Sequence, residues 1–132
     1  MTVIDKIAWI HLDGGSVLST RNRGIDVYYL PGGKREPGES DVQTLVREVR
    51  EELGVGIAAG TARHLATFEA QAHGHPEGTT VRMACYTAAY EGTLMAGAEV
   101  EEYVWLTWAD RDRVSPVDRL VFDHLRAHRL LT

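Results

Sequence analysis

The sequence is poor in cysteine, in net positive charge and in long hydrophobic runs. Cys85 is the single cysteine among 132 residues, so no internal disulfide can form, and a reducing, cytoplasmic location is expected. There are 19 Asp and Glu residues against 14 Lys and Arg, a formal net charge of −5. This balance argues against a binder of nucleic acid polymers, which needs a basic face. A nucleotide substrate remains compatible with it, because a metal ion can supply the positive charge.

The apolar runs are far shorter than the roughly 20 residues of a membrane-spanning helix. Residues 1–5 lack the basic and apolar regions of a signal peptide. We therefore expect no membrane partner. With 44% hydrophobic and 25% charged residues, the composition excludes a disordered or collagenous chain. The length is enough for one core of its own, so residues 1–132 are expected to form a single domain.

Apolar stretches separated by turn-forming residues predict a sheet with two helices. Residues rich in β-branched and aromatic side chains predict strands at 6–12, 16–21, 27–30, 62–71, 79–90 and 100–107. Pro, Gly and charged residues predict a loop at 34–39. Strands arranged around two helices favour an α/β or α+β sandwich with a mixed sheet.

Two segments have helical periodicity. Apolar residues recur at helical spacing in residues 41–53, where Ser40 and Gln43 form a capping box and Gly54 ends the helix. A second helix is expected to begin after Ser115, which acts as its N-cap. The expected inner stripe of this helix comprises Val117, Leu120, Val121, His124, Leu125 and His128.

The first helix carries a cluster of carboxylates. Glu48, Glu51 and Glu52 fit on an arc of about 100° beside the apolar face. Like charges at this spacing repel each other, and they lie in the C-terminal half of the helix, where anions are disfavoured. One interpretation is a solvated face neutralised by Arg47 and Arg50. The other is a site for a hard divalent cation, Mg²⁺ or Mn²⁺.

The residues upstream favour the cation site. Gly33 is followed after five residues by Glu39, and after seven more by Arg47-Glu48-Val49-Arg50-Glu51-Glu52-Leu53-Gly54-Val55. This stretch, residues 33–55, resembles the signature GX5EX7REUXEEXGU of Nudix hydrolases, where U is apolar, and every specified position matches. The resemblance implies a Nudix-type α/β/α sandwich with a mixed sheet. It also implies divalent-cation-dependent hydrolysis of nucleoside diphosphates linked to another moiety.

The resemblance further implies which residues hold the cation, Mg²⁺ with Mn²⁺ as the alternative. It assigns the metal to oxygen ligands from the carbonyl of Gly33 and the side chains of Glu48, Glu51 and Glu52. Arg47 would hold the glutamates in place through a charge-assisted hydrogen bond. Glu39 would brace the preceding loop against the helix.

The general base varies within the family and is often a glutamate late in the chain. Glu99 is the favoured candidate and Glu102 the second, because they precede or begin an expected strand that leads to Trp105. Glu51 of the box is a third candidate. A covalent enzyme intermediate is not needed for this chemistry, and no motif for a Ser or Cys nucleophile is found.

Candidate substrate contacts flank the box. Basic residues there suit phosphate oxygens, and aromatic residues suit a base or sugar; the candidates are Arg21, Arg23, Tyr28, Lys34, Phe68 and His73. His73 and His75 also form a pair, but no third ligand at suitable spacing completes a zinc site.

The short chain without insertions looks most like the MutT-type nucleoside triphosphate pyrophosphohydrolases. The leading hypothesis is conversion of a (d)NTP, including oxidised nucleotides, into the (d)NMP and pyrophosphate. A second hypothesis is hydrolysis of ADP-ribose, a nucleotide sugar or a dinucleoside polyphosphate. A third is a catalytically silent nucleotide sensor, which the intact box glutamates oppose. The expected partner is a small nucleotide or organic pyrophosphate, and the chain is expected to be a monomer or a homodimer.

Overall fold

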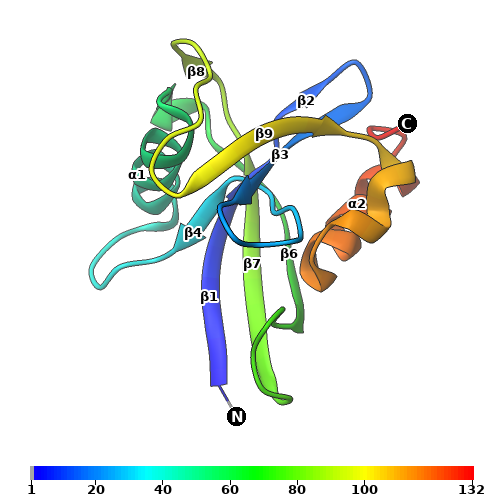
Figure 1. The fold of residues 1–132 in the computed structure, drawn as a ribbon. Coiled ribbons are helices and arrows are strands. Elements are labelled where there is room, and N and C mark those ends of the chain that lie inside the picture. The colour runs from blue at the N-terminus through cyan, green and yellow to red at the C-terminus, as the bar shows by residue number, and fades with distance from the viewer. Residues whose placement is uncertain (1) are drawn as a thin grey trace.

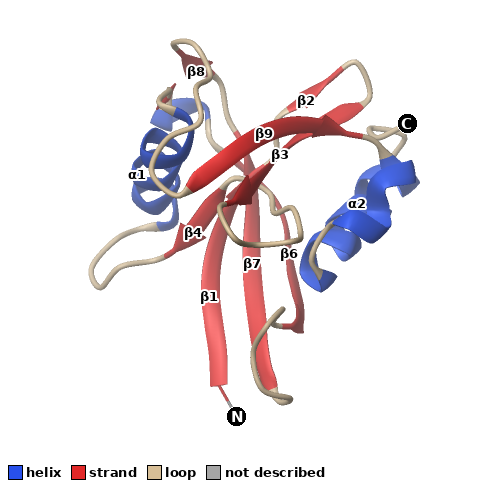
Figure 2. Ribbon diagram, viewed as in Figure 1, coloured by secondary structure: helices blue, strands red, loops and turns tan. Residues whose placement is uncertain are grey.

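The computed structural model describes residues 2–132 and places a mixed β-sheet between two α-helices (Figures 1 and 2). The helices are α1 (Asp41–Leu53) and α2 (Pro116–Ala127), with short 3-10 helices η1 (Ala59–Thr61) and η2 (Trp108–Arg113). The strands are β1 (Thr2–Trp9), β2 (Leu12–Asp13), β3 (Ser16–Asn22), β4 (Gly32–Lys34), β5 (Gly56–Ile57), β6 (Arg63–Gln71), β7 (Thr79–Thr87), β8 (Tyr90–Glu91) and β9 (Val100–Leu106).

The larger sheet has the strand order β4-β1-β7-β6. β1 runs parallel to β7, from Thr2 opposite Thr79 onward, and antiparallel to β4. A second, antiparallel sheet has the order β2-β3-β9 and crosses the upper part of the first in Figure 1. The predicted mixed sheet is therefore confirmed.

β1 supplies apolar side chains to both faces of the sheet. Ile7 and Trp9 belong to the hydrophobic cluster beneath α1. Ala8 of β1 and Ile10, the residue directly after the strand, belong to the cluster beneath α2. Successive side chains of a strand point to opposite faces, so one strand anchors both helices against the sheet.

The predicted bounds of α1 are confirmed at both ends. The Ser40 hydroxyl accepts from the backbone N–H of Gln43 at 3.1 Å, and the Gln43 side chain accepts from the Ser40 N–H at 2.9 Å. Gly54 ends the helix in the left-handed region with φ of 70°. Such local signals decide where a helix begins and ends.

The predicted inner face of α2 is confirmed for Val117, Val121 and Leu125, which are buried, and is wrong for Leu120 and His128. Leu120 is 38% exposed and His128 is exposed, whereas Asp118 and Phe122 are buried. The cluster beneath α2 accepts the Phe122 ring, which turns the helix away from Leu120. Ser115 is the N-cap, but its hydroxyl donates to Asp118 instead of accepting from the backbone.

Several predicted strand bounds are also wrong. Residues 27–30 join the sheets through single bridges at Tyr28 and Tyr29 and form no strand. Residues Gly32–Lys34, which reach into the predicted loop at 34–39, form strand β4 and pair with β1. β1 begins earlier than expected because its polar first half is held by pairing with β7, which local sequence does not report.

Two further findings concern Cys85 and membranes. Cys85 is buried in β7, where it packs as part of the core. No helix within residues 2–132 is long and apolar enough to cross a membrane.

The capping box predicts a stability effect. Ser40→Ala should lower the free energy of unfolding by about 1 kcal/mol, because the N–H of Gln43 loses its acceptor. Urea unfolding followed by circular dichroism measures this. Ser16→Ala is the matched control, since that hydroxyl donates only to the Asp13 carbonyl in a hairpin turn. Equal losses in the two variants would contradict the capping role.

Candidate active site

Two glycines bring the backbone of β4 against β1 and α1. A Cβ on Gly32 would lie 1.9 Å from the carbonyl oxygen of Ile7, and Gly32 has φ of 143°. A Cβ on Gly33 would lie 2.4 to 2.7 Å from the carboxyl group of Glu48. A side chain at either position would push these groups apart, so glycine is required for the backbone to approach the acidic helix.

Arg47 joins the loop before α1 to the helix. Its guanidinium donates to both carboxylate oxygens of Glu39, at 2.7 and 2.9 Å. It also donates to Glu48 at 2.8 Å and to the Lys34 carbonyl at 3.0 Å. The hydrogen bond from Arg47 holds the pKa of Glu39 down at about 2. Through these contacts, Arg47 of α1 is joined to Glu39 and Lys34 in the segment before the helix.

Two glutamates of α1, Glu48 and Glu52, are partly withdrawn from water. Burial raises the pKa of Glu52 to about 8, although its carboxylate accepts from the Gly32 N–H at 2.9 Å. Burial also raises the pKa of Glu48, against the opposing effect of Arg47. A buried carboxylate is costly in its ionised form unless a positive charge compensates it.

We use the name acidic cavity for a hollow of about 260 Å³ beside the C-terminal half of α1. It is lined by Asn22, Glu48, Glu51, Glu52, Ala98, Glu99 and Val100. The end of β3, one face of α1 and the segment entering β9 thus bring four carboxylates to one hollow.

The donor set of the acidic cavity fits a hard divalent cation, which prefers carboxylate and carbonyl oxygens. Burial disfavours the ionised form of Glu52, and a cation beside the carboxylate would favour that form. Within residues 2–132, no three His, Cys, Asp or Glu side chains converge closely enough to hold an ion as they stand. Glu48 is drawn toward Arg47 and Glu51 is 53% exposed, so a complete ligand set requires side-chain rotation.

The structure places Glu99 and Glu102, the two glutamates late in the chain, in different surroundings. Glu99 lines the acidic cavity. Glu102 lies opposite Arg21 in the β3–β9 pairing and accepts from its guanidinium at 2.7 and 3.1 Å. That hydrogen bond lowers the pKa of Glu102. Arg21 and Glu102 therefore form an ion pair with each other. Arg23 donates to the Ala98 carbonyl at 2.8 Å.

A second hollow of about 230 Å³, which we call the sheet cavity, lies between the β1–β7 face and the start of α2. Its apolar walls include Ile4, Ala8, Val81, Met83 and Val117. Its polar lining includes Lys6, Tyr29, Lys34, His73 and Asp118. Asn22 and Glu52 line both cavities, so the two hollows adjoin.

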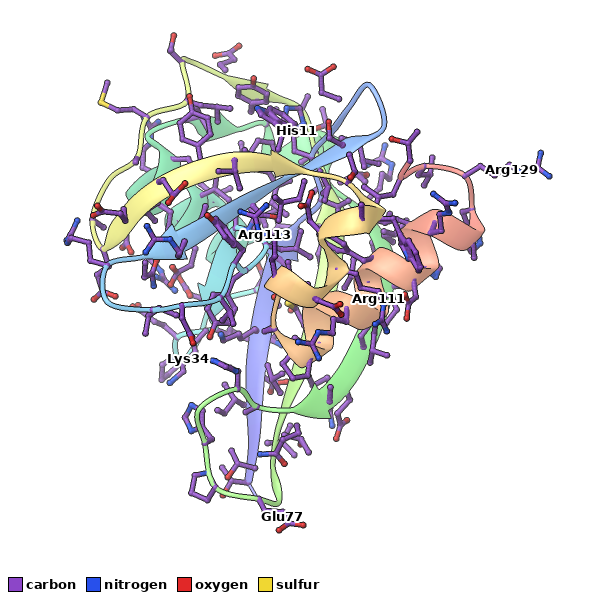
Figure 3. The ribbon with its side chains drawn as sticks, turned by 45° about the vertical axis from the view of Figure 1, so that its right-hand side comes forward. His11, Lys34, Glu77, Arg111, Arg113 and Arg129 are labelled. Carbon is purple, nitrogen blue, oxygen red and sulfur yellow. The ribbon has the colours of Figure 1, made fainter. Side chains whose placement is uncertain are left out.

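Two of the six sequence-predicted substrate contacts, Lys34 and His73, line the sheet cavity. In Figure 3, Lys34 lies toward the loop between β6 and β7, and Glu77 lies at the tip of that loop. Tyr28 is buried in the core, with the Arg113 guanidinium 5.0 Å from its ring centre, and its neighbour Tyr29 reaches the cavity instead. Phe68 packs 5.5 Å from His124 of α2. With Arg21 and Arg23 engaged elsewhere, these four residues line neither cavity.

Sequence reasoning missed Asp118. It is 1% exposed, and one carboxylate oxygen accepts from the Ser115 hydroxyl at 2.6 Å. The other oxygen, Oδ1, has no hydrogen-bond partner among the described residues. Burial raises the pKa of Asp118 to about 6. Acidic residues are common in the first turn of a helix, so Asp118 did not stand out in the sequence. The available signal for its burial was its position directly after Val117, on the packed face of α2.

Comparisons with known proteins place the chain beside pyrophosphohydrolases. A family model described as NUDIX domain matches residues 5–125. A CTP pyrophosphohydrolase of Escherichia coli (strain K12) is 34% identical over 110 residues, which cover 80% of this chain and 76% of that protein.

Solved structures show the same fold. The solution structure of the E. coli ORF135 protein has a TM-score of 0.75 at 27% identity, covering 98% of this chain and 94% of that chain. The MutT protein from Methanosarcina mazei Go1 has a TM-score of 0.78 at 18% identity, covering 96% and 95%. The second likeness concerns the fold alone.

The burial of Asp118 predicts a pH-dependent stability. Its pKa is about 6 in the fold against the usual 3.8 of an exposed aspartate. The folded state therefore binds more protons between these values, and stability falls as pH rises through this window. Above it the ionised group costs roughly 3 kcal/mol. Asp118→Asn should be more stable than the parent at pH 7.5, with a much smaller gain at pH 4.

Urea unfolding at the two pH values measures this difference. Asp112→Asn, at an exposed residue of η2, is the control and should change stability little at either pH. A gain for Asp118→Asn of the same size at both pH values would refute the burial explanation.

Proposed function

The chain belongs to the Nudix family, and from this premise we propose that it hydrolyses nucleoside triphosphates to nucleoside monophosphate and pyrophosphate. As a Nudix hydrolase it acts on the pyrophosphate bond of nucleotide substrates. The triphosphate assignment rests above all on the adjoining cavities: one is rich in carboxylates, and the other combines apolar walls with polar side chains. The similarity to a CTP pyrophosphohydrolase supports it.

We infer that the acidic cavity holds Mg²⁺, with Mn²⁺ as the alternative. Glu48, Glu51, Glu52 and the Gly33 carbonyl would hold the ion. When bound, a divalent cation neutralises phosphate oxygens and makes a coordinated water more acidic. The chain's own part is to fix these oxygens, and Arg47 does so for Glu48 through its 2.8 Å hydrogen bond.

Glu99 is our candidate for the general base. It reaches the acidic cavity from the segment before β9, opposite the carboxylates of α1. A base there takes the proton of the attacking water as the bond to phosphorus forms and the P–O–P bridge breaks. Glu102 is a poorer acceptor, because Arg21 stabilises its ionised form. Glu51 also lines the cavity and stays a second candidate.

The remainder of the nucleotide is assigned to the sheet cavity. The apolar walls from β1, β7 and α2 suit a nucleobase, and Asn22 stands where the two cavities meet. Lys34 and His73 line this cavity, and we assign Lys34 to a phosphate and His73 to the base or sugar. Arg21 and Arg23 would reach a substrate only after breaking their present hydrogen bonds.

A product assay tests the proposal. The purified protein with Mg²⁺ should convert a (d)NTP into the monophosphate and pyrophosphate, identified by mass. The panel includes oxidised nucleotides, ADP-ribose, dinucleoside polyphosphates and nucleotide sugars. Turnover confined to the linked diphosphates would refute the triphosphate assignment, and silence with both Mg²⁺ and Mn²⁺ would favour a nucleotide sensor.

Substitution of the glutamates separates their roles. Glu51→Gln and Glu99→Gln should each lower kcat by on the order of 100-fold or more, since a ligand or a base is lost. Glu102→Gln should lower kcat far less, because its carboxylate is held by Arg21. A greater loss in Glu102→Gln than in Glu99→Gln would reverse the assignment of the base.

The cation should also stabilise the fold. At a concentration about 100 times its dissociation constant, a bound ion adds about 2.7 kcal/mol to stability. Thermal unfolding with and without Mg²⁺ measures the response, and chelation should abolish it. Glu52→Gln should lose the response, whereas Glu77→Gln, at the loop tip in Figure 3, should retain it. An undiminished response in Glu52→Gln would remove Glu52 from the ligand set.

A further inference from the structure

The segment that leads to Glu99 is anchored to the end of α1. The Met95 N–H donates to the Leu53 carbonyl at 2.9 Å. The Gly97 N–H donates to the Glu52 carbonyl at the same distance. The carbonyls in the last turn of a helix have no partner within the helix, so both bonds satisfy acceptors that need one. One side of the segment is thus fixed by the helix that bears the candidate metal ligands.

Arg23 holds the same segment from the end of β3. Its backbone N–H donates to the Glu99 carbonyl at 3.0 Å, and its guanidinium donates to the Ala98 carbonyl at 2.8 Å. The first bond continues the β3–β9 pairing beyond Asn22, which lies opposite Val100. The second has a charged donor and is stronger than a neutral hydrogen bond. The Arg23 side chain lines neither cavity, so its contact is with the backbone that carries Glu99.

Ala98 has a backbone conformation that needs this support. Its φ is 50°, in the left-handed region that favours glycine. It is the second residue of a four-residue turn, which the Val100 N–H closes by donating to the Gly97 carbonyl at 3.0 Å. A residue other than glycine persists in this region only where its surroundings hold it there. Because Ala98 lines the acidic cavity beside Glu99, the strain lies at the site itself.

We propose that Arg23 is a positioning residue for Glu99. By binding the carbonyls of Ala98 and Glu99, it sets the direction in which the Glu99 side chain enters the acidic cavity. This inference rests on the proposed function, in which Glu99 takes the proton of the attacking water. A general base must lie within about 3 Å of the oxygen that loses the proton, so a small rotation of the turn takes it out of reach.

A positioning role and a phosphate contact predict different kinetics. Loss of a contact that binds the substrate as strongly in the ground state as in the transition state raises KM. Displacement of the base lowers kcat instead, because the substrate still binds. The present contacts of Arg23 favour the second case, since both its side chain and its backbone are bound to the turn.

A double-mutant cycle on hydrolysis tests the inference. Arg23→Ala should lower kcat by on the order of 10-fold and change KM by less than about 2-fold. In a Glu99→Gln background, the same substitution should cause almost no further loss, because the group that Arg23 positions is already gone. Arg23→Lys should restore part of kcat, since an ammonium can also donate to the Ala98 carbonyl.

Arg63→Ala is the matched control. Arg63 is also exposed, lines neither cavity and donates to backbone carbonyls, those of Gly60 and Ala62, at 3.3 and 3.0 Å. Its substitution should leave kcat unchanged in both backgrounds. Thermal unfolding should show that every variant is folded at the temperature of the assay.

Two outcomes would overturn the inference and leave the proposed function standing. One is a loss from Arg23→Ala that is as large in the Glu99→Gln background as in the parent, which indicates an independent contact with the substrate. The other is an unchanged kcat in Arg23→Ala, whether or not KM rises. A parent that hydrolyses only linked diphosphates would refute the triphosphate assignment, and the same cycle on that substrate would decide the role of Arg23. A parent silent on the whole panel would overturn both.

Discussion

The guanidinium of Arg47 ties the loop before α1 to the helix through two parallel bonds to Glu39 and one to Glu48. Glu39 in turn accepts from the Glu36 N–H and the Thr44 hydroxyl, at 2.9 and 3.0 Å. Planar bidentate pairs of this kind fix direction as well as distance. The position of Gly33 against Glu48 follows from this arrangement, because the loop and the helix are held at one spacing.

The charged groups of the site fall into paired and unpaired sets. Arg47 with Glu39, and Arg21 with Glu102, satisfy each other within the protein. Glu52 and Asp118 instead line cavities, where Glu52 accepts only from the Gly32 N–H and Asp118 Oδ1 has no partner among the described residues. Groups of the first kind hold the fold in shape. Groups of the second kind reduce stability in the free protein, which is the usual cost of a site that is completed by a ligand.

Local sequence signals predicted α1 to the residue and the acidic cluster on its face. Both depend on contacts between residues close in the chain, as with the capping box and Gly54. The burial of Asp118 could not be predicted in this way, because it depends on how α2 rotates to pack Phe122. Likewise, the choice of Tyr29 over Tyr28 as a cavity residue is set by long-range bridges. The family signature covers Glu48, Glu51 and Glu52 of the acidic cavity, but of the sheet cavity its specified positions include only Gly33 and Glu52.

The parallel pairing of β1 with β7 has a consequence for how the chain acquires its structure. Thr2 pairs with Thr79 and Trp9 with Tyr86, so the central ladder joins segments far apart in the chain. Helix α1 and the β2–β3 hairpin need only local contacts, whereas the central ladder must close a long loop first. During synthesis, β1 therefore emerges long before its partner, with the Ile7, Trp9 and Ile10 side chains uncovered. Final collapse onto the sheet is expected to be the slow step, and the interval before it is when the chain is most prone to associate with other chains.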